Sequence, residues 1–250
     1  MIAVGKQTTT GSGDKSTACT SRLALLATPL LQRGTAVAVA DGAVFVGYQS
    51  SDAMPYASGL VPTSLRPGIP CVIGSLDIVE GTRLTGVFFG GSDSGEECRV
   101  NDIAVSDDAT LLCAVGSYTG ESLIITEEAV LYPSDPTKEA GFVACFSSPS
   151  NAGAGPYTLL WASGSTFDFD TFLPQGHSSA TVTGVTLGLG SQHGALADRV
   201  YVSGTYFASN IEWGSDDGAG VSTFTLAPAE AEHDPCTAFV AAFDVASPSV

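Results

Sequence analysis

Three apolar runs recur in the same order three times along this chain, and this repetition constrains its fold more than any other feature. Each repeat begins with an apolar alternation, continues with a second apolar run and ends with a third. The alternations lie at 35–40, 100–105 and 182–187, the second runs at 44–48, 111–117 and 200–205, and the third runs at 71–77, 142–147 and 239–244. Because a short unit cannot bury its own apolar face, this repetition indicates units that stack on one another.

A fourth apolar run follows in the first two repeats, at 83–89 and 157–163, and turn residues rich in Gly and Asp separate the runs. No stretch of about 11 residues keeps the 3.6-residue period of a helix. Four short strands joined by turns are typical of one blade of a β-propeller. The sequence therefore predicts an all-β fold of β-propeller type, with about three blades of four antiparallel strands.

Three blades are fewer than the roughly four to eight of most propellers, so the ring is expected to be incomplete. Either a longer chain supplies additional blades, or copies of this chain complete a ring, or the sheets stack as an open arc. We prefer the first explanation. An open arc would leave two apolar blade faces exposed, which predicts self-association.

The repeat domain is predicted to span 21–250, after a disordered lead at 1–20 that is rich in Thr, Ser and Gly. An extra outer strand is expected at 22–28, because the last repeat ends after its third run and lacks a fourth. The repeats span about 35–98, 99–180 and 181–250. Insertions separate the second and third runs at 49–69, 119–140 and 206–237. Because long loops often carry function, these insertions are the expected binding elements.

The formal net charge is −17, from 26 acidic and 9 basic residues. Such a surface repels phosphate backbones and anionic lipids, so nucleic acid is not an expected partner. No run of about 18 apolar residues is present, so no transmembrane helix is predicted. Residues 23–31 loosely resemble the apolar part of a signal peptide, but a strand is the preferred interpretation and no signal peptide is evident.

The six cysteines show no CxxC spacing, which disfavours zinc ribbons and thioredoxin-like chemistry. Cys113 and Cys145 fall in neighbouring predicted strands and could form a disulfide if their side chains face each other. Buried free thiols are the alternative. The sequence does not decide between these two states.

The residues proposed to bind a ligand lie at or near the third insertion: Tyr206, Phe207, Trp213, Asp216 and Asp217. An exposed aromatic ring there could stack on a sugar or anchor a protein, although aromatic residues in such places are more often buried against a neighbouring blade. No metal site is predicted. The acidic clusters fit turn chemistry better than Ca²⁺ ligation, since none has EF-hand spacing. No cofactor is predicted and no catalytic residue can be assigned.

Residues 100–107, 199–206 and 237–244 resemble the short β-propeller repeat family found in many bacterial secreted and surface proteins. Its strands read approximately IAVD, VYVTG and AFVAKLD, and a fourth strand carries a Trp, a slot that Trp161 fills. The first repeat departs from the pattern, with Gly74 and Ser75 in mid-strand. The resemblance implies a propeller in an extracellular or cell-surface setting, and it implies no catalytic residues.

The sequence predicts a non-enzymatic binding or structural module that engages a protein or a glycan through its long insertions. The alternative is a carbohydrate-active hydrolase or lyase, whose two acids would lie at the blade ends, so enzymatic activity stays open. A third interpretation is an intracellular assembly scaffold, which six free thiols would favour.

Overall fold

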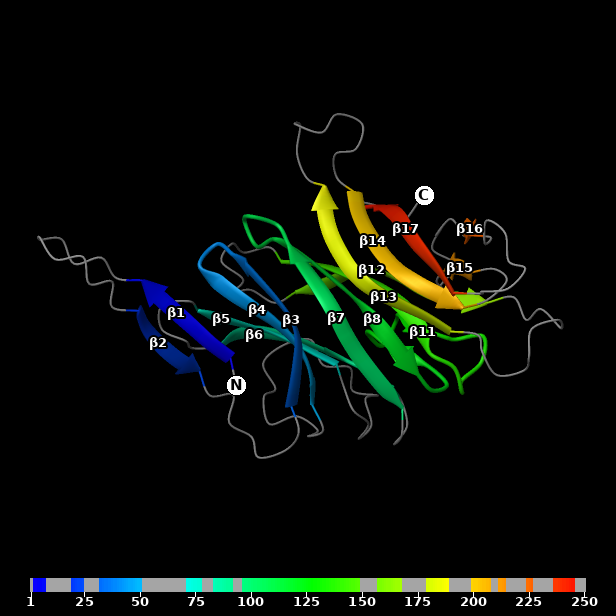
Figure 1. Cartoon of the computed structure of the whole chain (residues 1–250), viewed down its shortest axis with the longest axis horizontal. Coiled ribbons are helices and arrows are strands. Elements are labelled where there is room, and N and C mark those ends of the chain that lie inside the picture. Colours follow the sequence, from blue (N-terminus) through cyan, green and yellow to red (C-terminus); the bar gives the residue numbers. More distant parts are fainter. Residues whose placement is uncertain are drawn as a thin grey trace, which may run out of the picture.

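In a computed structural model the chain is all-β and consists of antiparallel sheets, with no helix among the described residues (Figure 1). This confirms the predicted fold class. Accordingly, no described helix is long and apolar enough to cross a membrane. The described residues are 2–7, 19–24, 32–50, 71–77, 83–91, 96–148, 157–167, 179–188, 199–207, 211–214, 224–226 and 236–245.

Each of the three repeats forms its own sheet, and the strands follow the predicted order. Sheet 1 contains, in spatial order, β3 (Gln32–Ala40), β4 (Ala43–Ser50), β5 (Cys71–Asp77) and β6 (Arg83–Phe89). Sheet 3 contains β13 (Ser179–Gly188), β14 (Arg199–Phe207) and β17 (Cys236–Asp244). Sheet 3 therefore has three strands, as expected for a repeat that ends after its third run.

Sheet 2 contains the four strands of the second repeat and two short strands that come from the third. Its spatial order is β7 (Glu97–Val105), β8 (Leu111–Thr119), β11 (Ala140–Ser147), β12 (Thr158–Phe167), β15 (Ile211–Gly214) and β16 (Phe224–Leu226). The third insertion thus reaches back and pairs with the outer strand of the preceding sheet. The sequence did not predict this addition.

The first strands of the sheets share a β-bulge at equivalent positions. The register shifts between Gly34 and Ala36 in β3, between Val100 and Asp102 in β7, and between Val182 and Gly184 in β13. Each shift lies just before the residue on which the repeats align, Val37, Ile103 or Val185. Bulges bend a strand and increase its twist. The three repeats therefore share a local backbone geometry as well as a sequence pattern.

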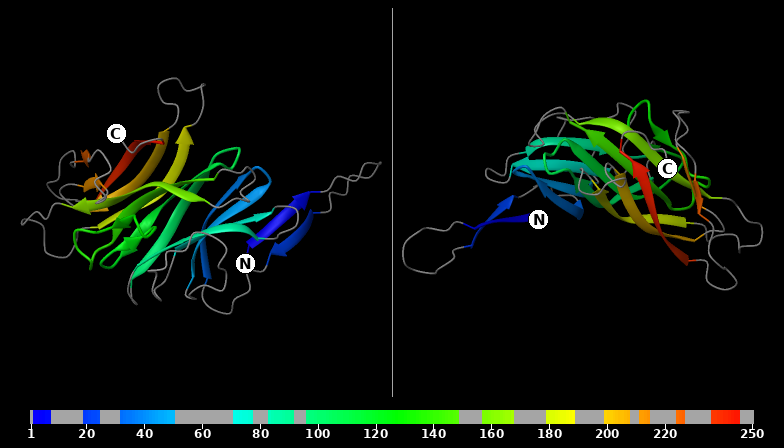
Figure 2. Two further views of the ribbon diagram at one scale, coloured as in Figure 1. Left: turned by 180° about the vertical axis from the view of Figure 1, so that it is seen from behind. Right: turned by 90° about the horizontal axis from the view of Figure 1, so that it is seen from above.

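The three first strands lie close to one another, β3 beside β7 and β7 beside β13 (Figure 1, Figure 2). Two separate cores fill the spaces between the sheets. Phe45, Leu112 and Phe142 belong to the core between sheets 1 and 2, whereas Cys113 and Val202 belong to the core between sheets 2 and 3. Residues 111–118 of β8 are therefore all buried, which explains their nearly continuous apolar run: successive side chains enter different cores.

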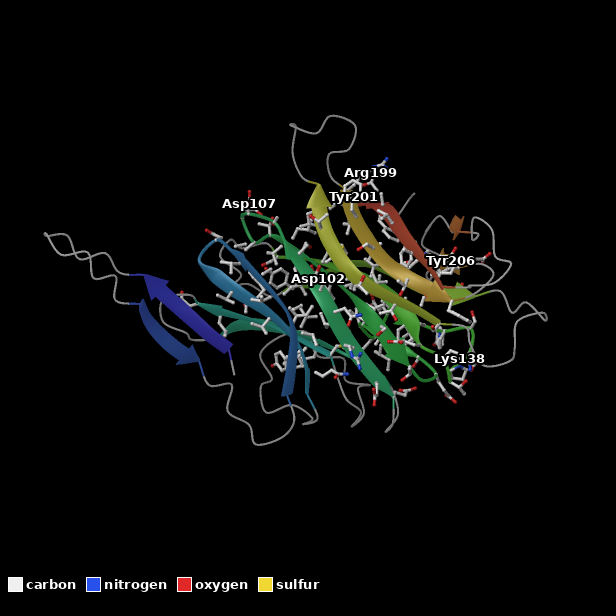
Figure 3. The ribbon with its side chains drawn as sticks, viewed as in Figure 1. Asp102, Asp107, Lys138, Arg199, Tyr201 and Tyr206 are labelled. Carbon is white, nitrogen blue, oxygen red and sulfur yellow. A yellow bond between two sulfur atoms is a disulfide. The ribbon has the colours of Figure 1, made fainter. Side chains whose placement is uncertain are left out.

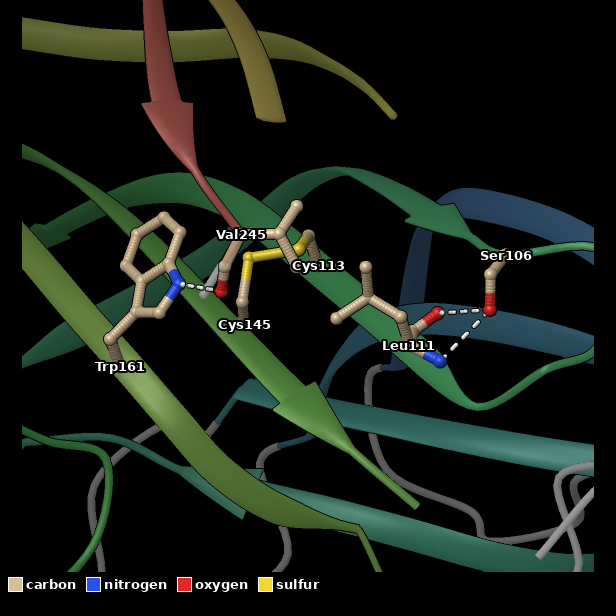
Figure 4. Close-up of a disulfide and its surroundings, with 6 residues drawn as sticks. All are labelled: Ser106, Leu111, Cys113, Cys145, Trp161 and Val245. Carbon is tan, nitrogen blue, oxygen red and sulfur yellow. Dashed lines mark hydrogen bonds between the residues drawn. A yellow bond between two sulfur atoms is a disulfide. The ribbon is translucent and has the colours of Figure 1, made fainter. Parts of the chain in front are cut away.

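Among the described residues, two disulfides involve the middle sheet. Cys113 and Cys145 lie directly opposite each other on β8 and β11 and are bonded, with a Cα–Cα distance of 4.1 Å (Figure 4). This is the pair that the sequence singled out. The second disulfide, Cys71–Cys98, joins β5 to β7 and so ties sheet 1 to sheet 2. Strand neighbourhood alone could not predict it, because its partners lie in different sheets.

The N-terminal segment forms a separate two-stranded sheet of β1 (Ile2–Gln7) and β2 (Cys19–Ala24). Strand β1 lies within residues 1–20, for which the sequence predicts a disordered lead. Strand β2 overlaps the outer strand expected at 22–28, but its partner is β1, and the backbone groups of the two strands satisfy each other. Among the described residues, β17 pairs with β14 alone.

Candidate functional site

The insertions between second and third strands leave the sheets at one end, which we call the insertion end. The hairpin turns of β3–β4 and β7–β8 lie at the opposite end, where Figure 3 labels Asp107, whereas Lys138 of the second insertion marks the insertion end. This arrangement follows from the repeat, because the second strand ends and the third strand begins at the same end of each sheet. Residues of different repeats can therefore form one surface there.

The second insertion is anchored by apolar side chains and by backbone pairing. It contains strands β9 (Leu123–Ile124) and β10 (Val130–Leu131), and Leu123 and Ile125 are fully buried in the core between sheets 1 and 2. The Ile124 amide donates to the Gly90 carbonyl at 2.8 Å, and the Gly90 amide donates back at 3.1 Å. The insertion thus extends the end of sheet 1 and is held in a defined position.

A buried carboxylate fixes the start of this insertion. The Glu96 side chain, with the residue only 5% exposed, accepts a hydrogen bond from the Glu121 amide at 2.7 Å. Gly120 has φ +118°, and a Cβ there or at Gly91 would overlap the Glu96 side chain. Both glycines are therefore required by close approach, and at Gly120 also by conformation.

A small polar depression lies beside the insertion, where β4 and β8 end and β7 begins. Gln49, Glu97, Arg99, Thr119 and Glu139 line it, and its volume is about 30 Å³. That volume holds only a water molecule or two, so a larger ligand would lie across this surface rather than enter it. The Gln49 side chain is fixed because its Nε2 donates to the Cys98 carbonyl at 2.6 Å. Arg99 and the two carboxylates offer charged hydrogen-bonding groups to such a ligand.

The second insertion also exposes an aromatic side chain, since Tyr132 is 51% exposed. Amphipathic rings of this kind supply much of the binding energy at protein and glycan surfaces. The sequence pattern pointed to such a ring in the third insertion and not to this one. Tyr132 follows the buried Leu131, and that contrast within a loop is the signal that could have identified it.

Two of the aromatic residues proposed as ligand-binding are core residues instead. Tyr206 is 2% exposed and Trp213 is fully buried, and both pack against Phe239, with ring centroids 6.2 and 5.7 Å apart. Alternation along β14 turns its even-numbered residues toward sheet 2, and pairing of β15 with β12 carries Trp213 into the same core. Phe207 is half-buried at the end of β14, and Asp216 and Asp217 lie outside the described residues.

The acidic turn at the opposite end has a structural function. Asp108 Oδ1 accepts hydrogen bonds from Ser106 Oγ at 2.7 Å, from Thr110 Oγ1 at 2.8 Å and from the Thr110 amide at 3.1 Å. The Ser106 and Thr110 hydroxyls therefore lower the pKa of Asp108 below its ordinary value. This matches the prediction that these acids serve turn geometry. Within the part of the chain that is described, no three His, Cys, Asp or Glu side chains form a metal-binding group.

The same turn is tied to β12 by a buried phenol. Tyr157 Oη donates to the Ala109 carbonyl at 2.7 Å, and its ring meets Phe45 of sheet 1 edge-on. Burial, aided by the negative charge of Asp108, raises the pKa of Tyr157 to about 12. This phenol is a packing and hydrogen-bonding group at the junction of sheets 1 and 2.

No protein-family model, curated protein or solved structure matches this chain.

Proposed function

We propose that this chain is a non-enzymatic binding or structural module of β-propeller type that engages a protein or a glycan through its insertion end. One observation carries the proposal: the anchored second insertion presents the exposed Tyr132 and borders the polar depression at Arg99. An aromatic ring for stacking and charged groups for hydrogen bonding suit a shallow surface that recognises a sugar or a protein.

The two disulfides support an extracellular or cell-surface setting for this module. Cys71–Cys98 and Cys113–Cys145 are both bonded, and disulfides persist mainly in oxidising compartments. The acidic composition also favours a neutral or basic partner over nucleic acid. Further blades from a longer chain would be compatible with this proposal, because the insertion end would only grow wider.

The experiment is a glycan array and a proximity-labelling capture with the wild type, followed by affinity measurements on the partner that is found. Tyr132→Ala is expected to weaken binding about tenfold to a hundredfold, and Arg99→Ala by about tenfold. The matched controls are Tyr201→Ala and Arg199→Ala, which remove the same residue types from the outer side of sheet 3 (Figure 3). Unchanged affinity in the Tyr132 and Arg99 variants would exclude the insertion end as the binding surface. Turnover of a bound glycan would replace the proposal by the hydrolase alternative.

A further inference from the structure

Strand β17 forms one edge of sheet 3, and no described strand lies on its other side. The corresponding positions in the other sheets are covered. In sheet 1, β5 is followed by β6, and in sheet 2, β11 is followed by β12 and then by β15 and β16. An edge strand presents a row of backbone amide and carbonyl groups that can pair with another strand.

The sequence of β17 contains none of the usual devices that keep an edge strand apart from others. Residues 236–243 read CTAFVAAF, with no charged residue and no proline, and the first charge is that of Asp244. Natural edge strands are usually interrupted by a lysine, a proline or a bulge. Pairing of β17 with β14 is continuous over all nine residues, so no bulge turns the edge away.

The most exposed large apolar side chain among the described residues lies on this strand. Val240 is 73% exposed and points away from sheet 2. Its cross-strand neighbour on β14 is Ser203, with Thr205 two residues further on, so its surroundings on that face are polar. A further sheet stacked on this polar face would gain little. A strand added beside β17 would instead cover Val240 from the side.

The sequence of β17 is compatible with antiparallel pairing to itself. With Val240 opposite Val240 of a second copy, Ala238 lies opposite Ala242, Phe239 opposite Ala241, and Asp244 opposite Cys236. No like charges face each other, and small residues flank the central valines, which suits cross-strand packing. A two-fold axis through this point needs only one self-complementary patch.

We propose that β17 pairs with β17 of a second copy of this chain, so that two copies of sheet 3 form one continuous sheet. The contact consists of main-chain hydrogen bonds and the two Val240 side chains. Because each copy carries a net charge of −17, the copies repel one another, and added salt screens that repulsion. Association is therefore expected to become stronger as the salt concentration rises.

Sedimentation velocity of the oxidised protein, over a hundredfold range of concentration at low and at high salt, tests this proposal. The wild type is expected to form a dimer, and the dissociation constant of this dimer should be at least tenfold lower at high salt than at low salt. Val240→Lys places a charge on the edge and is expected to give a monomer under all these conditions. Val37→Lys is the matched control, since Val37 is 62% exposed on sheet 1, and it is expected to dimerise as the wild type does. Near-UV circular dichroism checks that both variants keep native packing.

A second variant reports the register directly. Val240→Cys is expected to form a covalent dimer on mild oxidation, whereas Val37→Cys is not, because only position 240 meets its own copy. A wild type that stays monomeric at high salt overturns the proposal. So does a dimer that survives Val240→Lys, or one that is lost in Val37→Lys, because the contact then lies elsewhere on the chain.

Discussion

The two end sheets of the molecule differ in the faces they turn away from the middle sheet. On sheet 1 this outer face carries Val44, Val46 and Tyr48, which are buried, together with Val37 and Val39, which are 62% and 63% exposed. On sheet 3 the outer face is mainly polar and includes Thr181, Thr186, Tyr201, Ser203 and Thr205. The outer face of sheet 1 is therefore mainly apolar, whereas the outer face of sheet 3 is mainly polar apart from Val240.

Equivalent positions in the repeats show how this difference arises. Val37, Ile103 and Val185 occupy the same place after each bulge, and Ile103 is 4% exposed because sheet 1 covers it. Val37 lies on the corresponding side of sheet 1 and is 62% exposed. On the opposite side, Cys113 of sheet 2 is buried against sheet 3, and its counterpart Tyr201 in sheet 3 is only half-buried. Equivalent positions are therefore apolar on the outer face of sheet 1 and more polar on the outer face of sheet 3.

A charged residue introduced on each of these two outer faces should give the largest expected difference in the free energy of unfolding. Val46→Asp buries an unpaired carboxylate and should lower the free energy of unfolding by at least about 3 kcal/mol. Thr205→Asp, at an exposed position of sheet 3, should change it by no more than about 0.5 kcal/mol. Urea unfolding measures both. Equal changes in the free energy of unfolding would show that the two outer faces do not differ in burial.

Removal of the disulfides separates the two interfaces of the middle sheet. Replacing Cys71 and Cys98 together by Ala should cost about 3 kcal/mol, because a loop of this length gains much freedom in the unfolded chain. Hydrogen exchange should then increase in sheet 1 more than in sheet 3. The double variant of Cys113 and Cys145 is the comparison, since that bond lies within sheet 2. A uniform increase of exchange after the first replacement would contradict the assignment of Cys71–Cys98 as a tie between sheets.

Alkaline pH should weaken the junction of sheets 1 and 2, where Tyr157 is buried. Tyrosine in an unfolded chain ionises near pH 10, whereas the pKa of folded Tyr157 is about 12. Its contribution to stability is complete below pH 10 and is lost as the pH rises from 10 to 12, by up to about 2 kcal/mol. Tyr157→Phe should remove this pH dependence, at a cost of about 1 kcal/mol at neutral pH for the bond to Ala109. Unfolding measured from pH 8 to 12 gives the result, and an unchanged slope in the variant would exclude Tyr157 as its source.

The junction of sheets 2 and 3 contains a carboxylate instead, and its loss should cost less than the loss of a disulfide. Asp102 Oδ2 accepts the Val185 amide at 3.0 Å, and Asn101 Nδ2 donates to the Val182 carbonyl at 2.8 Å, so the bulge of β7 holds the bulge of β13. Asp102→Ala should cost about 1 to 2 kcal/mol and should raise the exchange rate of the Val185 amide. Asp102→Asn keeps an acceptor and should restore most of the protection. If the Val185 amide exchanges at the same rate in the wild type and both variants, its hydrogen bond to Asp102 does not contribute to stability.

Much of this architecture could be predicted because it follows from local pattern. Strand order within each repeat comes from consecutive apolar runs joined by turns, and the alignment on Val37, Ile103 and Val185 locates three equivalent bulged strands. The addition of β15 to β12 could not be predicted, because it pairs segments of different repeats across a long connection. The same limit applies to Cys71–Cys98.

The binding surface was less predictable than the fold. Composition drew attention to Tyr206 and Trp213, but aromatic residues near a loop enter a core when their strand's alternation points inward, as Tyr206 does. Arg99 becomes a candidate only when the second insertion is seen to fold beside the start of β7, and Tyr132 only when its exposure is known. Both depend on tertiary structure, about which sequence periodicity carries no information.

The return of β15 onto β12 has a consequence for how the molecule comes apart. In a simple array of repeats, a terminal unit can fray without disturbing the others. Here sheet 3 cannot leave without also pulling away the short strands that border sheet 2, and Trp161, whose Nε1 donates to the Val245 carbonyl at 3.1 Å, would lose its partner (Figure 4). Strands of the C-terminal repeat are part of the neighbouring sheet, so the two repeats should unfold in one cooperative step.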